Sequence, residues 1–286
     1  MKNHILVTGG TGFIGGALTK VLRVAGYKVT SVSRSSAETE DHFAVDLADK
    51  ESVAEFVRDL ESVTTVIHCA AIAHGKTPPQ KYSIADFNTL ILENLISAFG
   101  SLQPHWIFLS SISVYGEGYE KKPVPIMVQP ETTDVYGLGK LRDEQRLLAT
   151  CDNLDIIRLM PTYDLEHMED VKKRIFFPKT SIKFRILPPP NYCLCNVSLV
   201  GDAVLKCLDR ISGRRLHQVG DKELLSQRDL LEKFPGFAVT IPQVLIKICI
   251  RLIPIQLKLG CTVRLLLKKL AQPNVYELGI VDLPCK

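Results

Sequence analysis

The sequence of 286 residues lacks the features that mark several protein classes. No uncharged apolar stretch reaches the ~18 residues that a membrane-spanning helix needs. No low-complexity tract and no internal period of about 20 to 50 residues is present, which excludes solenoids and propellers. The net charge of +4 is modest and spread along the chain, so we expect no nucleic-acid partner.

Metal and disulfide patterns are missing as well. The eight cysteines are scattered without a CxxC pair, and the histidines show no metal-ligand spacing, so we expect reduced thiols and no metal site. An apolar strand at 4–7 begins almost at the N-terminus, so no signal peptide is expected and a cytoplasmic location is predicted. A hydrophobic content of 46% and a charged content of 23% are typical of a globular protein with a full core.

Glycines form the most informative local pattern. Gly9, Gly12 and Gly15 follow the strand at 4–7 and open a helix whose apolar residues recur at helical spacing over 13–25. In such a strand-turn-helix unit the first glycine allows the tight turn and the second lets backbone N–H groups approach a pyrophosphate. The third lets the helix pack close to the strand, and the helix N-terminus faces the phosphate charge. The pattern therefore predicts a dinucleotide site.

Strand-like and helix-like segments alternate along most of the chain. Strand patterns occur at 28–33, 42–45, 64–68, 106–110 and 155–158, and helical patterns at 51–60, 84–99 and 136–150. This alternation predicts an α/β fold with a doubly wound parallel sheet, in which ligands bind beyond the carboxyl ends of the strands.

The domain division follows from where this alternation stops. We expect residues 1–165 to form a Rossmann domain that binds NAD(P). A strand at 192–197, a helix at 199–211 and a strand at 217–220 indicate that 190–222 returns to the sheet. Residues 166–189 and 223–286 are then predicted to form a small C-terminal substrate-binding lobe, helical from about residue 223.

Three polar residues form an acid-base pattern. Tyr136 and Lys140 are four residues apart on an expected helix and share a face, and Ser111 follows the strand at 106–110. We expect the Lys140 ammonium to lower the pKa of the Tyr136 phenol. The Ser111 hydroxyl is expected to bond the oxygen that gains charge as hydride arrives. We therefore assign Ser111, Tyr136 and Lys140 as catalytic residues.

Read in order, these motifs resemble the extended short-chain dehydrogenase/reductase family of NAD(P)-dependent nucleotide-sugar epimerases and dehydratases. The resemblance covers residues 3 to about 235, and further matches occur at Asp46-Leu47, 68–71, Asn88, 110–116 and 197–204. It departs after Arg158, where 159–164 lack the family's usual glycine. The resemblance, together with the residues at the end of the second strand, implies a set of cofactor contacts. They are Gly9, Gly12, Phe13, Ile14, Gly15, Ser33, Arg34, Asp46, Leu47, Ala70, Ala71, Asn88, Tyr136, Lys140 and Pro161.

The end of the second strand bears on the choice of cofactor. Ser33 and Arg34 stand where an NAD enzyme usually carries an acidic residue that bonds the ribose 2′-hydroxyl. An arginine offers a 2′-phosphate a full charge and two hydrogen bonds. We therefore expect NADP rather than NAD.

The expected cofactor favours one reaction within the family. An epimerase retains its cofactor, which is commonly NAD, whereas a net reductase consumes NADPH. Because NADP is the expected cofactor, the sequence favours NADPH-dependent reduction of a 4-keto-6-deoxy sugar nucleotide in polysaccharide biosynthesis. A nucleotide-sugar 4-epimerase that resembles UDP-glucose 4-epimerase and uses the same residues is the alternative. A catalytically inactive NADP-binding sensor or scaffold is a third hypothesis. Dehydration is disfavoured because no acidic pair accompanies Ser111.

Apolar segments with interspersed lysine and arginine characterise the C-terminal region. Helices are expected at 242–253 and 257–270. Three interpretations of them stay open: packing within the lobe, a homodimer interface, and peripheral contact with a membrane surface. The sequence favours the first two.

Overall fold

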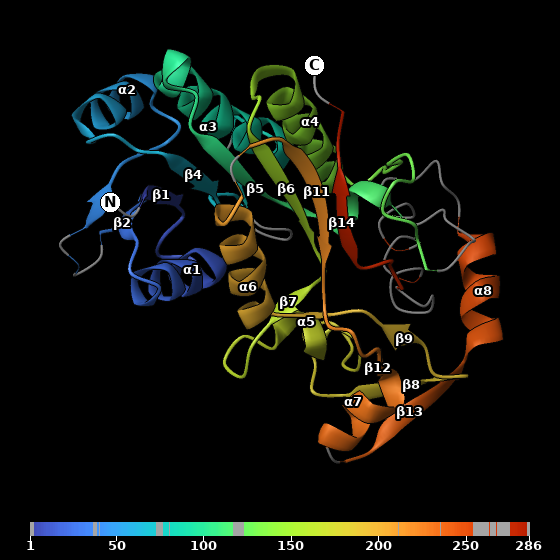
Figure 1. Cartoon of the computed structure of the whole chain (residues 1–286). Coiled ribbons are helices and arrows are strands. Elements are labelled where there is room, and N and C mark those ends of the chain that lie inside the picture. Colours follow the sequence, from blue (N-terminus) through green and yellow to red (C-terminus); the bar gives the residue numbers. More distant parts are fainter. Residues whose placement is uncertain are drawn as a thin grey trace.

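The computed structural model describes residues 3–36, 39, 41–72, 77–79, 81–116, 123–210, 212–234, 236–253, 263, 267 and 275–284. A large sheet with the strand order β14-β11-β6-β5-β4-β1-β2-β3 runs through the molecule (Figure 1). Its strands are β1 (His4–Thr8), β2 (Lys28–Ser33), β3 (His42–Ala44), β4 (Thr65–His68), β5 (His105–Ser111), β6 (Leu154–Leu159), β11 (Arg214–Val219) and β14 (Gly279–Asp282). All pairings are parallel except that of β11 with β14. The predicted doubly wound parallel sheet is therefore confirmed.

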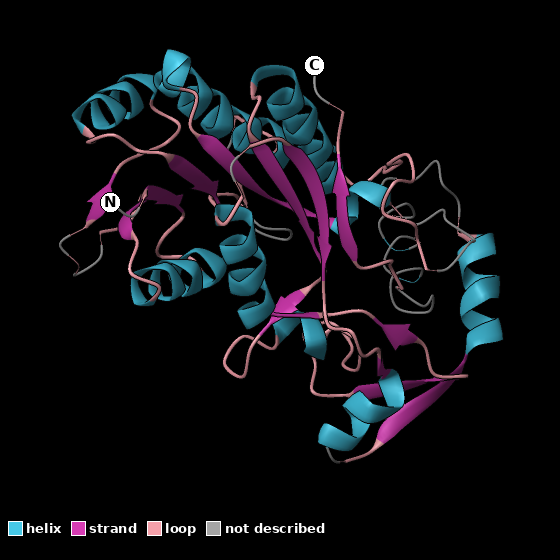
Figure 2. Cartoon of the chain, in the orientation of Figure 1, coloured by secondary structure: helices cyan, strands magenta, loops and turns pink. Residues whose placement is uncertain are grey.

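Helices cover both faces of this sheet (Figure 2). One layer holds α1 (Phe13–Val24) and α6 (Val197–Leu208), and the other holds α2 (Lys50–Asp59), α3 (Ile84–Phe99) and α4 (Val135–Thr150). Successive residues of the strands point to opposite faces, so Ile5 and Val7 join the core under α1 and α6, and Leu6 joins the core on the other side. Burial on both faces explains why the strands read as continuous apolar runs.

A second part of the chain carries short two-stranded sheets and small helices. Its strands pair as β7 (Thr162–Tyr163) with β10 (Cys195–Asn196), β9 (Asn191–Tyr192) with β12 (Leu225–Ser226), and β8 (Lys183–Leu187) with β13 (Ala238–Pro242). Its helices are α5 (Glu169–Lys172), α7 (Gln227–Lys233) and α8 (Gln243–Leu252). Two short 3-10 helices, η1 (Gly100–Leu102) and η2 (Ile112–Tyr115), flank β5.

The C-terminal region differs from the sequence prediction in three ways. The expected strand at 192–197 is split between β9 and β10, and neither joins the large sheet. Among the described strands between residues 190 and 222, only β11 lies in that sheet. The region after residue 223 is not purely helical, because β12, β13 and β14 lie in it. β14 joins the large sheet as an edge strand and is not part of the lobe. In that position Val281 of β14 packs against the core of the sheet. The remaining domain division stays a prediction.

The apolar C-terminal segments are only partly described. The expected helix at 242–253 corresponds to α8. The expected helix at 257–270 lies outside the described residues, apart from positions 263 and 267. In the described ranges, no helix has both the length and the apolar character that a bilayer crossing requires.

Candidate active site at the carboxyl edge of the sheet

The turn between β1 and α1 is shaped by its glycines. Gly9 has a φ of +73°, which favours glycine, and its N–H donates to the carbonyl of Val32 at 2.7 Å. A Cβ on Gly15 would lie 2.2 Å from the carbonyl oxygen of Gly9, so a larger residue cannot fit without a backbone shift. The turn therefore holds the start of α1 directly against the end of β1.

The N-terminus of α1 is suited to an anion. No side chain in the described part of the chain caps this helix at Gly12, and its first turn contains no acidic residue. Side chains do cap α2, α3 and α6, through Asp49, Ser83 and Asn196, whereas no described side chain caps α4. Backbone N–H groups and the positive end of the helix dipole at α1 thus fit a diphosphate.

The floor beside this turn is built from the end of β4. Thr8 Oγ1 accepts hydrogen bonds from the N–H groups of Cys69 at 3.1 Å and Ala70 at 3.0 Å, and lies 2.9 Å from His68 Nδ1. Burial, with a further contribution from Lys140, lowers the pKa of His68 to about 3, so this imidazole is neutral and structural.

Asn88 shapes the segment that follows β4. Its Oδ1 accepts from the N–H of Ile72 at 2.7 Å, and its Nδ2 donates to the carbonyl of Ile72 at 3.2 Å. The side chain is buried on α3. In the structure Asn88 therefore acts on the loop containing Ala70 and Ala71, and it positions their backbone at the edge of the sheet.

Ser111 ends β5 and begins η2. Its Oγ donates to Ser113 Oγ at 3.1 Å and accepts from the Ser113 N–H at 3.2 Å. The short helix is packed tightly against α4, because a Cβ on Gly137 would lie 2.3 Å from the carbonyl oxygen of Ser113. This close approach brings the start of α4, with Tyr136, to the same edge as the half-buried Ser111.

Lys140 lies one helical turn after Tyr136 and is buried. Its Nζ donates to the carbonyl of Leu109 at 2.8 Å and lies 4.6 Å from the centre of the Phe108 ring. Burial lowers the pKa of Lys140, and nearby carboxylates, Asp143 first among them, oppose that effect. The lysine therefore ties α4 to β5 beside the proposed acid.

The expected effect of Lys140 on the Tyr136 phenol is not found. Burial, followed by the carboxylates of Asp134, Asp143 and Asp170, raises the pKa of Tyr136 to about 12. The sequence analysis missed these carboxylates, two of which lie within seven residues of the tyrosine. The phenol therefore holds its proton at neutral pH in this structure.

The comparisons with known proteins agree with this architecture. Residues 5–162 match the model of the NAD dependent epimerase/dehydratase family. The chain belongs to this family. The expected resemblance to NAD(P)-dependent short-chain dehydrogenases/reductases, and the prediction of an enzyme, are thereby confirmed.

Two known enzymes align over more than half of the chain. A UDP-glucose 4-epimerase of Vibrio cholerae is 32% identical over 223 residues, which are 73% of this chain and 67% of that protein. A dTDP-4-dehydrorhamnose reductase of Mycolicibacterium smegmatis is 24% identical over 57% of this chain and 47% of its own length.

Solved structures share the fold. A short-chain dehydrogenase/reductase superfamily protein of Agrobacterium tumefaciens with bound NAD has a TM-score of 0.70 at 20% identity, covering 84% of this chain and 86% of the other. A UDP-glucose 4-epimerase of Thermotoga maritima with UDP-glucose has a TM-score of 0.66 at 20% identity, covering 84% and 85%.

The residues expected to contact the adenosine end of the cofactor lie at the ends of β2 and β3 or just after them. The Ser33 hydroxyl donates to the carbonyl of Ser35 at 2.8 Å and accepts from Thr11 Oγ1 at 3.0 Å. Arg34 is exposed, and so is Asp46, whereas Leu47 beside it is buried. The charged side chains of this end are thus Arg34 and Asp46, while Ser33 is used within the fold.

The segment after β6 is where the chain departs from the family pattern. Pro161 is half-buried and its carbonyl accepts from the Cys195 N–H at 3.0 Å, which joins the segment to β10. Further on, the His167 ring stacks on Phe13, with 4.2 Å between ring centres. Ile14 packs against the core under α1. Sequence reasoning missed His167, which has no distinctive spacing.

A buried ion pair supports α4 from the side of the sheet. Glu144 of α4 accepts from Arg158 of β6 at 3.0 Å (Nε to Oε1) and 2.6 Å (Nη2 to Oε2), and Ser110 also donates to Glu144. Arg158 Nη1 also donates to the Tyr115 hydroxyl at 2.8 Å, and this hydroxyl in turn donates to Gln218 Oε1. The network joins α4, β5, β6, η2 and β11 under the proposed site.

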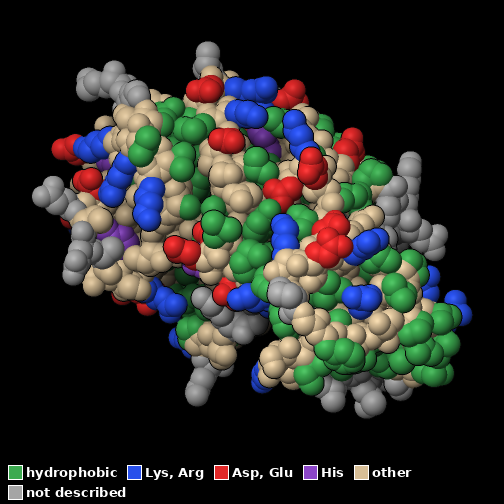
Figure 3. All heavy atoms as spheres, turned by 90° about the horizontal axis from the view of Figure 1, so that it is seen from below, with side chains coloured by type: hydrophobic (Ala, Val, Ile, Leu, Met, Phe, Trp, Pro, Cys, Tyr) green, Lys and Arg blue, Asp and Glu red, His purple; other side chains and the backbone are tan. Residues whose placement is uncertain are grey.

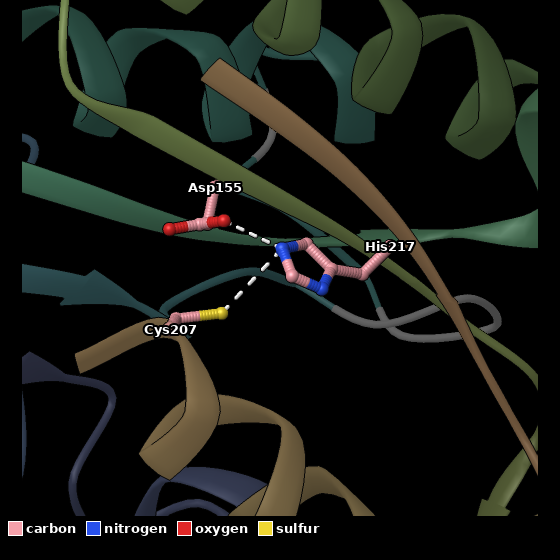
Figure 4. A group of neighbouring side chains, drawn as sticks. All are labelled: Asp155, Cys207 and His217. Carbon is pink, nitrogen blue, oxygen red and sulfur yellow. Dashed lines mark hydrogen bonds and ion pairs between the residues drawn. The ribbon is translucent and has the colours of Figure 1, made fainter. Parts of the chain in front are cut away.

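A second charged cluster lies toward the amino-terminal ends of β5, β6 and β11, and Figure 4 draws three of its neighbouring side chains. Asp155 of β6 contacts Arg215 at 2.7 Å through each oxygen, His105 at 2.7 Å and His217 at 2.5 Å. Burial alone raises the pKa of Asp155, but the hydrogen bonds from Arg215, His105 and His217 outweigh it and hold the pKa far below its usual range.

This cluster includes side chains that could hold a metal. The ligand atoms of Asp155, Cys207 and His217 lie within 4.8 Å of one another (Figure 4). However, the Arg215 guanidinium already engages both Asp155 oxygens and supplies the positive charge that an ion would bring. We therefore interpret the group as a structural ion cluster.

Proposed function

We propose that this protein is a nucleotide-sugar 4-epimerase. The observation that carries the proposal is the placement of Ser111 and of the helix bearing Tyr136 and Lys140 at one sheet edge, next to an uncapped helix N-terminus. The relative of Vibrio cholerae, a UDP-glucose 4-epimerase, supports this assignment over the expected net reductase. The glycine turn fits a dinucleotide, and a UDP-sugar is the proposed substrate.

The proposed mechanism assigns one task to each residue. The nicotinamide cofactor would supply reversible hydride transfer at the sugar C4 carbon. Tyr136 moves a proton to and from the C4 oxygen, and Ser111 donates a hydrogen bond that stabilises charge on that oxygen. Because the pKa of Tyr136 is raised to about 12, the phenol is protonated and is set to donate its proton to the C4 oxygen of the 4-keto sugar, and the reverse step uses the phenolate. Lys140 holds the helix that carries Tyr136 on β5, because its Nζ donates to the carbonyl of Leu109.

The test is direct interconversion of UDP-glucose and UDP-galactose by the purified protein, followed by chromatography of the sugar nucleotides. The proposal expects turnover without net consumption of cofactor, and it expects Tyr136→Phe to abolish most of it. Absence of turnover by the wild type on UDP-hexoses and UDP-N-acetylhexosamines would refute the assignment.

NADPH-dependent reduction of a 4-keto-6-deoxy sugar nucleotide is the second candidate. The exposed Arg34 after β2 favours it, because an arginine there suits a 2′-phosphate. The similarity to the reductase of Mycolicibacterium smegmatis points the same way. Stoichiometric loss of NADPH absorbance with a dTDP-linked 4-keto sugar, without epimerase turnover, would select this function instead.

A further inference from the structure

Helix α8 presents apolar side chains to the outside. Ile246 and Ile250 face inward and share a small core with Phe184 and Ile186 of β8. On the outward side lie four large apolar residues, and their exposed fractions are 60% for Val244, 51% for Leu245, 46% for Ile248 and 74% for Leu252. Helices on the surface of globular proteins usually carry polar residues on that side.

The four outward residues form one continuous stripe. Val244, Ile248 and Leu252 are spaced by four residues, and Leu245 lies seven residues before Leu252, so all share one helix face. Lys247 and Arg251 are also exposed and border the stripe. We call these six residues the α8 face.

Exposed apolar side chains continue along the two strands that lead to α8. Leu187 in β8, which pairs with Pro242 just before α8, is exposed, and so are Val239 in β13 and, just beyond the far end of that strand, Phe237 at 84%. Figure 3 shows hydrophobic side chains gathered at the lower right of the molecule, on the side of α8, with lysine and arginine side chains near them. A contiguous apolar surface with a polar rim marks an interaction site.

The stretch of sequence that contains α8 carries charge of one sign. From residue 237 to residue 276 the sequence contains six basic residues and no acidic one. The basic residues are Lys247, Arg251, Lys258, Arg264, Lys268 and Lys269. An acidic surface complements the exposed Lys247 and Arg251. A second copy of the α8 face does not, because a twofold contact would set these two residues against their equivalents.

We propose that the α8 face docks the protein on an anionic lipid bilayer. The apolar stripe enters the boundary between headgroups and acyl chains, while Lys247 and Arg251 contact lipid phosphates. With ten residues, α8 lies in the plane of the surface and does not cross it. The proposal is independent of which reaction the site catalyses.

The experiment is cosedimentation of the whole protein with vesicles. Vesicles of phosphatidylglycerol and phosphatidylcholine are compared with vesicles of phosphatidylcholine alone, at low and high salt. We expect binding to the anionic vesicles that weakens with salt. Ile248→Ser with Leu252→Ser should weaken it by about 10- to 100-fold, and Lys247→Gln with Arg251→Gln by about 20- to 30-fold.

The matched control changes an exposed apolar and an exposed basic residue elsewhere. Val24 on α1 is 90% exposed, and Arg58 on α2 is exposed as well, so Val24→Ser with Arg58→Gln should leave vesicle binding unchanged. Thermal unfolding checks that each variant is folded. Lys247→Gln with Arg251→Gln changes exposed side chains alone, so this variant tests the charge without disturbing the apolar packing.

Three results would overturn the proposal. The first is no cosedimentation of the wild type with anionic vesicles. The second is an equal loss of binding in the control variant. The third is a dimer in light scattering that Ile248→Ser with Leu252→Ser dissociates, while vesicle binding is absent. That last result would assign the α8 face to a second copy of the chain.

Discussion

Replacing Asp155 by asparagine should lower the free energy of unfolding by about 3 to 5 kcal/mol. The substitution keeps the size of the side chain and removes its charge. Asp155 is fully buried, and Arg215, 4% exposed at its side chain, lies 2.7 Å from both of its oxygens. The variant leaves that guanidinium in the interior without a counter-charge, and this uncompensated charge is the source of the cost.

An exposed ion pair provides the control. Glu61 contacts Lys28 at 2.6 Å, and the two side chains are 81% and 54% exposed, so water replaces the lost contact on both sides. Urea unfolding followed by circular dichroism should give Asp155→Asn a midpoint well below wild type and Glu61→Gln a midpoint close to it. In thermal unfolding the Asp155→Asn loss corresponds to about 6 to 20 °C. Equal losses in the two variants would refute the reasoning.

The pH dependence follows from the direction of the pKa shift. The folded pKa of Asp155 is held far below the unfolded value of about 3.9, so its stabilisation is fully present above about pH 5. Below about pH 4 the unfolded chain binds a proton that the folded chain does not, and the stabilisation declines. The gap between wild type and Asp155→Asn should therefore narrow as the pH falls. A chelator should not change the wild-type midpoint, and a lower midpoint would show that the cluster holds a metal.

Three further predictions concern the carboxyl edge. Tyr136→Phe should reduce turnover by about 10²- to 10⁴-fold with near-normal cofactor affinity, measured by single-turnover kinetics and fluorescence titration, and unchanged turnover would exclude the phenol as the acid. Arg34→Ala should weaken NADPH binding by about 10- to 150-fold and NADH binding far less, whereas equal weakening would exclude a 2′-phosphate contact. Gly15→Ala should destabilise the fold by about 1 to 3 kcal/mol, because its methyl group would lie 2.2 Å from the Gly9 oxygen, and a wild-type unfolding midpoint would contradict that packing.

The sheet and the site at its carboxyl edge could be predicted because their signals are local. The turn containing Gly9 and Gly15 and the four-residue spacing of Tyr136 and Lys140 each lie within one short segment. Alternation of strands and helices then fixes the edge at which such segments meet. What the sequence analysis missed depends on pairing between distant segments. β14 joins the sheet only through its register with β11, where Leu216 faces Val281.

The charged clusters were missed for the same reason. Asp155 lies in β6, whose other residues except Arg158 are apolar, and its partners Arg215 and His217 come some 60 residues later, where the parallel register of β6 and β11 brings them close. The carboxylates that raise the pKa of Tyr136 come partly from α5, beyond the segment that carries the motif. The available signal for these clusters was the presence of charged residues in strands predicted to be buried, because a buried charge requires a partner.

The face of α4 that packs on the sheet carries both a proposed site residue and buried charged residues that fix the helix. Tyr136, Lys140 and Glu144 are spaced by four residues and lie on one side of the helix. Lys140 is bonded to β5 through Leu109, and Glu144 is bonded to β6 through Arg158. The helix is therefore fixed at two consecutive turns by buried charged groups, and only its first turn reaches the edge where substrate would bind. These interior contacts therefore hold the helix turn that carries Tyr136 at the edge where Ser111 ends β5.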